Sequence, residues 1–185
     1  MPTPDRTSLG AIIRAGREIL ESQGIARLTM QAVAERVGVR APSLYKRVRN
    51  REALIGLIAA DAVEDLGEQL DEVASHSADA RGRLRELAYA FRAFAHANPA
   101  GFRLIFAGSD ATRPDPALLA TAAAPLLRAT RELAGPDEAL EAARTLTAWA
   151  SGFVSMELAN GFRLGGDVER AFEFGATRLV DALAL

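Results

Sequence analysis

The stretch from Leu28 to Leu54, LTMQAVAERVGVRAPSLYKRVRNREAL, constrains the fold more than any other part of the chain. Its first half predicts a helix from Thr29 to Val37, because apolar residues recur at spacings of three and four and Thr29 can cap the first turn. Gly38 is expected to end that helix, since glycine adopts a left-handed backbone without strain. A second, short helix is expected from about Pro42 to Val48, with proline in a first turn that needs no amide. This order predicts a helix-turn-helix.

The outward face of the second helix is polar and basic, whereas Leu44 and Val48 face inward. Hydroxyl, amide and cationic side chains reach phosphates and base edges when such a helix enters a major groove. The plain alternative is a helical hairpin with a solvated basic face. We predict DNA contacts from Thr29 and Gln31 near phosphate, Arg40, Ser43 and Lys46 at base edges, and Tyr45, Arg47 and Arg51 at the phosphate backbone.

Charge is distributed unevenly along the chain, although the net charge is only −2. Residues 1–55 hold ten Lys and Arg against five Asp and Glu, and the remaining residues hold twelve against nineteen. A basic head on an acidic remainder is typical of a protein that holds DNA with one end. Residues 1–7 are expected to form a loose arm, from which Arg6 could also reach DNA.

The order and spacing of these residues resemble the tetracycline-repressor (TetR) family of transcriptional regulators, strongly so over about the first third of the chain. The sequence departs from the family at Arg40, where Ser or Thr is frequent, and at Arg47-Val48, where a His-Phe pair is frequent. The resemblance implies a homodimeric, cytoplasmic bacterial repressor that leaves a palindromic DNA operator when a small molecule binds. The matching residues are Leu28-Thr29-Met30, Val33-Ala34, Val37-Gly38-Val39, Ser43-Leu44-Tyr45 and Glu52-Ala53-Leu54.

The rest of the chain also reads as helices, so the predicted fold is all-α with about nine helices. A helix-turn-helix DNA-binding domain is expected at residues 1–52, and a helical ligand-binding and dimerisation domain at 53–185. Pro125 should kink the helix that contains it. Besides the two described above, the expected helices span about Leu9–Gln23, Asn50–Ser75, Asp79–Ala97, Pro99–Ala107, Asp115–Ala134, Pro136–Asn160 and Asp167–Leu183.

The expected helix from Pro136 to Asn160 is apolar nearly all round in its centre, TLTAWASGFVSM. A helix with no polar face must be covered on several sides, so we expect a partner subunit to cover its stripe of small residues, together with the last helix. The resembled family pairs such helices as a four-helix bundle, whereas the alternative is a central core helix of a monomer. The predicted interface comprises Ala143, Thr147, Ala150, Val154, Leu158, Phe172, Gly175 and Leu179.

A ligand pocket is expected among the helices between Asn50 and Asn160. Few charges fall within the apolar stripes, which favours an apolar or aromatic effector, but Arg92 and Arg103 could instead recruit an anion. The segment from Trp149 to Phe162 resembles the C-terminal variety of the family named for a Trp-His-Gly signature, with Ser151 at the histidine position. The candidate pocket residues are Phe91, Phe94, Phe102, Phe106, Trp149 and Phe153.

Composition gives no support to catalysis or to a cofactor. The chain has no cysteine, and its two histidines, His76 and His96, have no ligand set nearby, so no metal site is expected. No phosphate loop or nucleophile motif is present, and neither a signal core nor a membrane span is indicated. Two other classes stay open: an enzyme that carries a DNA-binding head, and a ligand-independent protein-interaction or architectural DNA-binding module.

Overall fold

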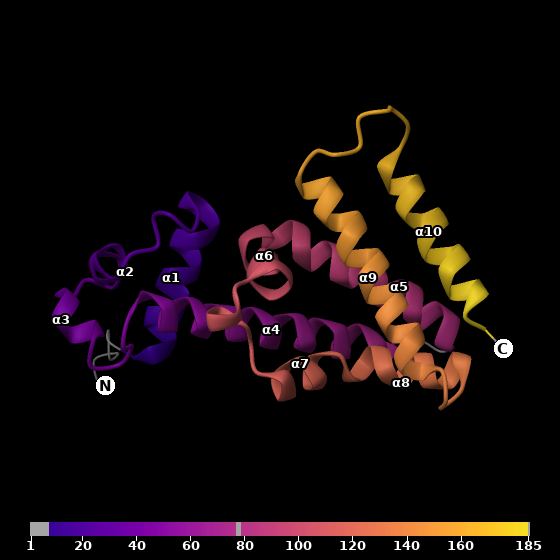
Figure 1. Ribbon diagram of the computed structural model, residues 1–185, viewed down its shortest axis with the longest axis horizontal. Coiled ribbons are helices and arrows are strands. Elements are labelled where there is room, and N and C mark those ends of the chain that lie inside the picture. The colour runs from indigo at the N-terminus through magenta and orange to yellow at the C-terminus, as the bar shows by residue number, and fades with distance from the viewer. Residues whose placement is uncertain (1–7, 77–78, 185) are drawn as a thin grey trace. The chain divides into compact units, whose positions relative to one another are not determined.

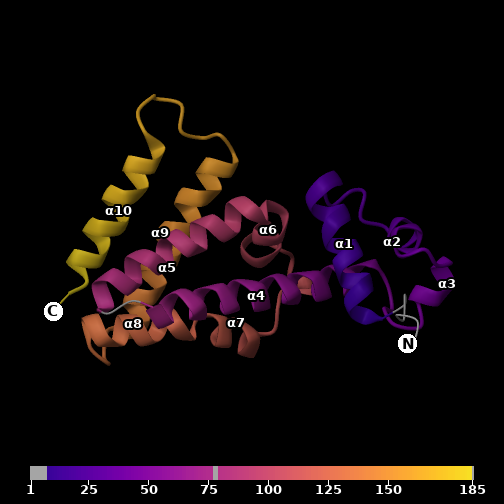
Figure 2. The same ribbon diagram turned by 180° about the vertical axis from the view of Figure 1, so that it is seen from behind.

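The computed structural model describes residues 8–76 and 79–184, and this part of the chain is all-α, with ten α-helices and one 3₁₀ helix (Figures 1 and 2). The predicted all-α fold class is therefore confirmed. The predicted arm at residues 1–7, with Arg6, lies outside the described residues. Contacts divide the chain into two compact units: unit 1 comprises Met1–Glu64 and Asn98–Leu118, and unit 2 comprises Asp65–Ala97 and Leu119–Leu185.

The first helices of unit 1 begin where the sequence supplies side-chain caps. Ser8 Oγ accepts a hydrogen bond from the Ala11 amide at 3.2 Å, and Thr29 Oγ1 accepts one from the Ala32 amide at 3.1 Å. Gly38 ends α2 with a left-handed backbone (φ 78°, ψ 36°), as predicted. The elements of this unit are α1 (Leu9–Gln23), α2 (Met30–Val37), α3 (Ala41–Leu44), the first half of α4 (Arg51–His76), α6 (Pro99–Ala107) and the 3₁₀ helix η1 (Asp110–Thr112).

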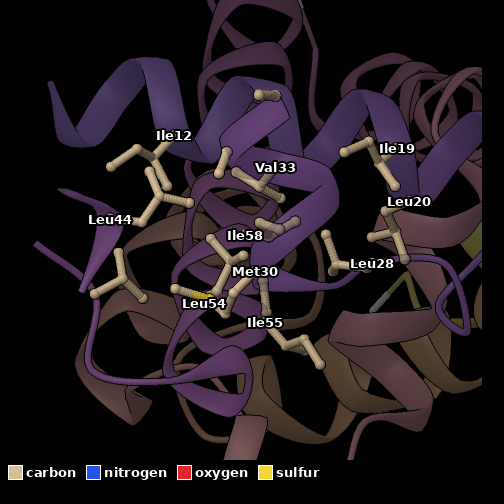
Figure 3. Close-up of a cluster of buried hydrophobic side chains, with 14 of the residues drawn as sticks. Ile12, Ile19, Leu20, Leu28, Met30, Val33, Leu44, Leu54, Ile55 and Ile58 are labelled. Carbon is tan, nitrogen blue, oxygen red and sulfur yellow. The ribbon is translucent and has the colours of Figure 1, made fainter. Parts of the chain in front are cut away.

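One cluster of buried apolar side chains holds the helix-turn-helix together (Figure 3). It draws residues from α1, α2, α3 and α4, so the short α3 has no core of its own and depends on its neighbours. Val39, between α2 and α3, is half-buried against the same cluster, as expected for the residue at the corner of two crossed helices. The side chains labelled in Figure 3 are Ile12, Ile19, Leu20, Leu28, Met30, Val33, Leu44, Leu54, Ile55 and Ile58.

The second helix of the motif is shorter than predicted. It ends at Leu44, and residues 45–47 form a turn, although the Val48 amide still donates to the Leu44 carbonyl at 2.9 Å. Arg40 stands at the N-cap and makes no side-chain capping bond, so the helix lacks the cap that would offset its short length. Leu44 and Val48 are buried, as predicted, with 0% and 2% of their surface exposed.

Unit 2 is built on α5, which packs against α8, α9 and α10, while α8 also packs on α9. Asp79 and Asp167 supply caps, since their carboxylates accept from the amides of Gly82 and Arg170 at 2.9 and 3.2 Å. The loop of residues 159–167 joins α9 to α10 (Figure 1). The helices are the second half of α4, α5 (Ala80–Ala97), α7 (Pro116–Ala122), which begins in unit 1, α8 (Ala124–Ala134), α9 (Ala139–Leu158) and α10 (Val168–Ala182).

A single kinked helix from Asp115 to Ala134 was predicted, and this is wrong. The chain forms two helices, α7 and α8, which are separated at Ala123. The ring of Pro125 excludes the carbonyl four residues earlier from a helical hydrogen bond, so the helix stops and a new one begins. Pro125 then lies in the first turn of α8, where no amide is needed. The extra helix accounts for ten helices where about nine were expected.

Candidate functional site

The residues predicted to contact DNA surround α3 and the start of α2. Arg40, Tyr45, Lys46 and Arg47 are exposed and Ser43 is half-buried, so the structure brings these five together on and beside the short helix. Within residues 8–76 and 79–184, the side chains of Arg40 and Lys46 have no hydrogen-bond or ion-pair partner. Their cations are thus available to an anionic partner, which is the property that phosphate contact and base readout require.

Thr29 and Gln31 lie at the opening of α2, where both side chains are exposed. The Thr29 hydroxyl accepts from the Ala32 amide, which leaves its proton for an acceptor outside the protein. Gln31 Nε2 donates to Glu35 Oε1 at 2.7 Å, one turn along the same helix. That bond holds the Gln31 amide along the surface of α2, and Gln31 still offers its amide oxygen.

Arg51, predicted at the phosphate backbone, has a structural role that the sequence did not indicate. Its Nε donates to the Leu28 carbonyl at 2.6 Å, and its Nη2 donates to the Ile25 carbonyl. These bonds join the first turn of α4 to the connection between α1 and α2. A guanidinium carries five N–H groups, so these two bonds leave others for a further partner.

Two side chains of α1, Arg17 and Glu21, make polar contacts with distant parts of unit 1, and sequence reasoning missed both. Arg17 Nη1 donates to Asp61 Oδ2 at 3.0 Å, and its Nη2 donates to Asn98 Oδ1 at 2.9 Å. The Glu21 carboxylate accepts from the amides of Ala100 and Gly101 at 2.9 and 2.8 Å, and so caps α6 from α1. The partners are 44 to 81 residues apart, beyond the reach of any local pattern.

The six aromatic residues predicted to line a ligand pocket occupy several places. Phe102 and Phe106 lie on α6 in unit 1, with ring centroids 4.9 Å apart, whereas the other four lie in unit 2. Phe94 is 1% exposed and Phe91 lines a cavity of about 40 Å³. Trp149 and Phe153 are half-buried and pack on the ring of Phe172. The structure therefore does not gather the six around one space.

The cavity in unit 2 is small and apolar. Its lining comes from α4, α5, α8 and α9. At about 40 Å³ it is far below the roughly 300–1,000 Å³ of a drug-sized ligand site, so the described conformation would have to open before such a ligand entered. The lining residues are Leu70, Leu84, Leu87, Ala88, Phe91, Leu126, Leu146, Thr147 and Ala150.

Four of the residues predicted for the interface on α9 and α10 are already covered within the single chain. Ala143, Ala150, Val154 and Phe172 were assigned to a partner subunit, but each is at most 5% exposed within this single chain. The small side chains of α9 let α5 and α8 approach closely, so they form the core of the chain itself. The other predicted interface residues, Thr147, Leu158, Gly175 and Leu179, are half-buried and stay predictions.

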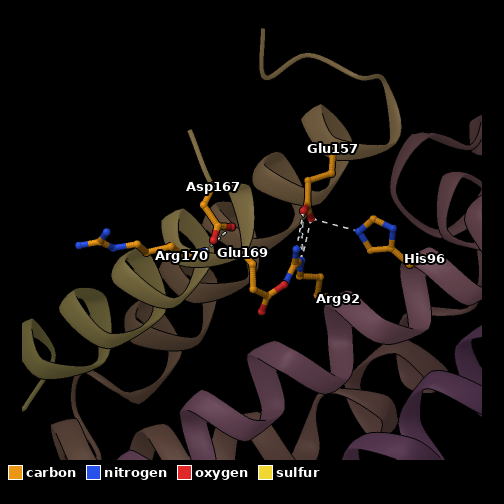
Figure 4. Close-up of polar contacts among 6 residues, drawn as sticks. All are labelled: Arg92, His96, Glu157, Asp167, Glu169 and Arg170. Atoms are coloured by element: carbon orange, nitrogen blue, oxygen red, sulfur yellow. Dashed lines mark hydrogen bonds and ion pairs between the residues drawn. The ribbon is translucent and has the colours of Figure 1, made fainter. Parts of the chain in front are cut away.

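A polar network holds α5, α9 and α10 together beside this core (Figure 4). Arg92 donates from Nη2 to Glu157 Oε1 at 2.7 Å and also bonds Glu169, and His96 Nε2 lies 3.2 Å from Glu157 Oε2. Burial by itself would raise the pKa of Glu157, but the hydrogen bonds from Arg92 and His96 outweigh it and lower the pKa below its ordinary value. Glu157 is therefore held as a carboxylate, which anchors α9 to α5.

The part of the chain that the structure describes holds no group of three or more His, Cys, Asp or Glu side chains placed to bind a metal ion. Among the same residues, no helix is long and apolar enough to serve as a membrane span.

A helix-turn-helix with an exposed basic face, carried by a chain that continues as helices, is the arrangement of a DNA-binding regulator. Comparisons with known proteins agree. Residues 12–58 match the model of bacterial regulatory proteins of the tetR family, and residues 84–179 match the tetracyclin repressor-like C-terminal domain. The tetracycline repressor protein class A of transposon 1721 from Escherichia coli is 32% identical over 163 residues, which cover 86% of this chain and 73% of the repressor. The chain belongs to the TetR family of transcriptional regulators, whose members are not enzymes.

Solved structures extend the comparison over nearly the whole chain. A variant of TetR from Acinetobacter baumannii AYE, in complex with minocycline, is 27% identical, covers 95% of both chains and has a TM-score of 0.70. BioQ with its double-stranded DNA operator is 26% identical, covers 95% of this chain and 96% of BioQ, and has a TM-score of 0.67. Curated HTH-type regulators of Mycobacterium tuberculosis and Mycobacterium bovis match at 31% identity over 97 residues, and the chain spans only 42% of their length. The Trp-His-Gly variety of the C-terminal domain stays a prediction.

Proposed function

We propose that this chain is a homodimeric repressor that binds a palindromic operator in the bacterial cytoplasm and leaves it when a small molecule enters unit 2. The observation that carries the proposal is the exposed pair Arg40 and Lys46 beside α3, whose side chains have no partner among the described residues, on a helix-turn-helix with a buried core. A two-fold dimer presents two such helices to successive major grooves, which is why a palindrome is expected. The complex of BioQ with its operator and the class A tetracycline repressor support the proposal by similarity.

We further propose residues 1–52 as the DNA-binding domain and residues 53–185 as the ligand-binding and dimerisation domain. The division falls within α4, whose first turn carries Arg51 on the helix-turn-helix side. Base contacts are assigned to Arg40, Ser43 and Lys46, and contacts to phosphate to Thr29, Gln31, Tyr45, Arg47 and Arg51. Binding should weaken as salt rises, because each phosphate contact releases a condensed counterion.

Selection of binding sites from random duplex DNA with the full chain should recover a palindrome with half-sites about one helical turn apart. Lys46→Ala should weaken operator binding by about tenfold, because a base-edge contact is lost, and binding to random DNA by about two- to threefold. Arg131→Gln, an exposed arginine on α8, serves as the control and should change neither affinity. Equal losses on operator and random DNA after Lys46→Ala would contradict a base-reading role.

The ligand part of the proposal rests on the cavity of unit 2 and on the minocycline complex of a similar chain. An apolar or aromatic compound that releases the protein from its operator should lose its effect in Ala88→Leu, because the added side chain fills the cavity. Operator affinity without the compound should be unchanged in that variant.

The small volume of the unit 2 cavity in the described conformation favours a second candidate, a ligand-independent architectural DNA-binding module. Operator binding that no compound in a broad apolar panel alters would support this module.

A further inference from the structure

A larger cavity, of about 730 Å³, lies within unit 1, and of its lining residues only Arg51 is assigned a contact in the function proposed above. We call it the α1–α6 cavity. Its walls are the end of α1, the turn after it, the first turns of α4, α6 and the segment that follows α6. This volume is within the range of small-molecule sites. The residues that matter for its chemistry are Ile25, Arg51, Glu52, Ile55, Arg103 and Leu104.

Most of the apolar wall of the cavity is fixed by core packing. Leu20, Ile55 and Leu104 belong to the buried core and are 2%, 4% and 6% exposed, so their faces toward the cavity are held by packing. Ile25, by contrast, is 48% exposed and lies in the turn between α1 and α2. A ligand with an apolar body would cover Ile25. Binding would then be favoured, because the apolar surface of Ile25 is removed from water.

The charged part of the wall is biased toward cations. Arg103 is exposed on α6, and its side chain has no hydrogen-bond or ion-pair partner among the described residues. Arg51 donates to two backbone carbonyls and keeps other N–H groups. Of the two acids, Glu21 already receives the amides of Ala100 and Gly101, which leaves Glu52 as the acid without a described partner. Two guanidinium groups thus face one acid that is not already bonded.

We propose that the α1–α6 cavity binds a small organic anion, an apolar body that carries one carboxylate or sulfonate, with the anion on Arg103 and the body against Ile25, Ile55 and Leu104. Arg103 supplies a charge-assisted hydrogen bond, and Arg51 adds a second cation on the α4 side. Glu52 opposes the anion and so limits its affinity. The site is separate from the cavity of unit 2 in every lining residue.

The test compares two probes that share one skeleton. The anionic dye 8-anilino-1-naphthalenesulfonate carries the sulfonate, and 1-anilinonaphthalene lacks it; both become fluorescent in an apolar site. In titrations of the full chain, Arg103→Gln should raise the Kd of the sulfonate about tenfold, and Glu52→Gln should lower it about twofold. Neither change should alter the Kd of the uncharged probe by more than about twofold. Arg131→Gln, outside both cavities, should leave both probes unaffected.

Amide chemical shifts of the full chain locate the bound sulfonate. Changes at Gly24, Ala107 and Gly108 support the α1–α6 cavity, and changes confined to Ala88 and Ala150 overturn the proposal. The proposal is also overturned when Arg103→Gln leaves the sulfonate affinity unchanged, or when the sulfonate does not bind at millimolar concentration. None of these measurements uses DNA, so they stand or fall separately from the proposed repressor function.

Discussion

The ion pair of Arg92 and Glu157 shows how strongly the stability of unit 2 can depend on a single side chain. The two side chains are 14% and 7% exposed, and the guanidinium also lies 4.7 Å from the centroid of the Phe172 ring. A carboxylate in this place has lost much of its hydration, and only the donors that surround it offset that loss. Removal of one partner therefore costs more than the intact pair contributes, because the other charge is left behind.

Glu157→Gln should lower the free energy of unfolding by about 2 kcal/mol at pH 7, since Arg92 then loses one of the two carboxylates that it contacts and keeps Glu169. Urea unfolding followed by circular dichroism measures this. Glu173→Gln, an exposed acid on α10, is the matched control and should change stability by less than about 0.5 kcal/mol. Equal effects of the two substitutions would contradict the role given to the buried pair.

The same pair predicts a pH dependence with a definite sign. The pKa of Glu157 is raised by burial and lowered more by the hydrogen bonds from Arg92 and His96, so its net pKa in the folded chain is below the ordinary value. The stabilisation is then fully present above the ordinary carboxyl pKa of about 4.3 and is lost as pH falls through the folded-state pKa. The stability difference between the native chain and Glu157→Gln should shrink below about pH 4. A difference that stays constant from about pH 7 to about pH 3 would contradict this.

At the scale of elements, two glycines should respond in opposite directions to the same substitution. Gly38 ends α2 at φ 78°, a conformation that alanine adopts only with strain, so Gly38→Ala should destabilise the chain by about 1 kcal/mol or more. Gly56 lies inside α4, where an added Cβ meets nothing within 4 Å, so Gly56→Ala should stabilise it by about 0.5–1 kcal/mol. Thermal unfolding of both variants measures the pair. Two shifts of the same sign would contradict the assigned backbone roles.

The beginnings of α1, α2 and α10 were predictable from the sequence because their signals are local. Ser8, Thr29 and Asp167 each cap the helix they precede, and apolar spacing then gives the extent. The end of α3 and the break at Ala123 were not predicted. Both depend on whether a short or proline-containing segment is stable as a helix against the packing of its neighbours, which the local sequence does not show. The side of α9 that its own chain covers was not predictable for a different reason, because a helix that is apolar all round does not show which side faces the core.

At the scale of the whole molecule, we expect the dimer to form through side chains that the single chain leaves uncovered in unit 2. Phe174 on α10 is 65% exposed and Met156 on α9 is 47% exposed. Phe174→Glu should convert dimer to monomer without loss of helix content, because a charge would be buried at an apolar contact. Sedimentation velocity measures the mass, and Leu9→Glu, at a 40% exposed leucine on α1, is the control that should stay dimeric. A dimer that survives Phe174→Glu would place the interface elsewhere.

The division into units was only partly visible in the sequence. Charge separates a basic first third of the chain from an acidic remainder, and the boundary between them lies close to the end of the helix-turn-helix. Residues 98–118, however, belong to the compact unit that contains the helix-turn-helix, and Glu21 and Arg17 make part of that connection. Such contacts join residues far apart in the chain, so the spacing of apolar residues along the sequence does not predict them.

The chain has one tryptophan, Trp149, and its position has a practical consequence. The indole stacks on Phe172 with centroids 5.0 Å apart, and it occupies the space where a Cβ on Gly175 would come within 2.5 Å of Cζ2. Its emission therefore depends on the fit of α9 against α10. Without any label, the spectrum of the native protein can therefore report a change in the packing of these two helices.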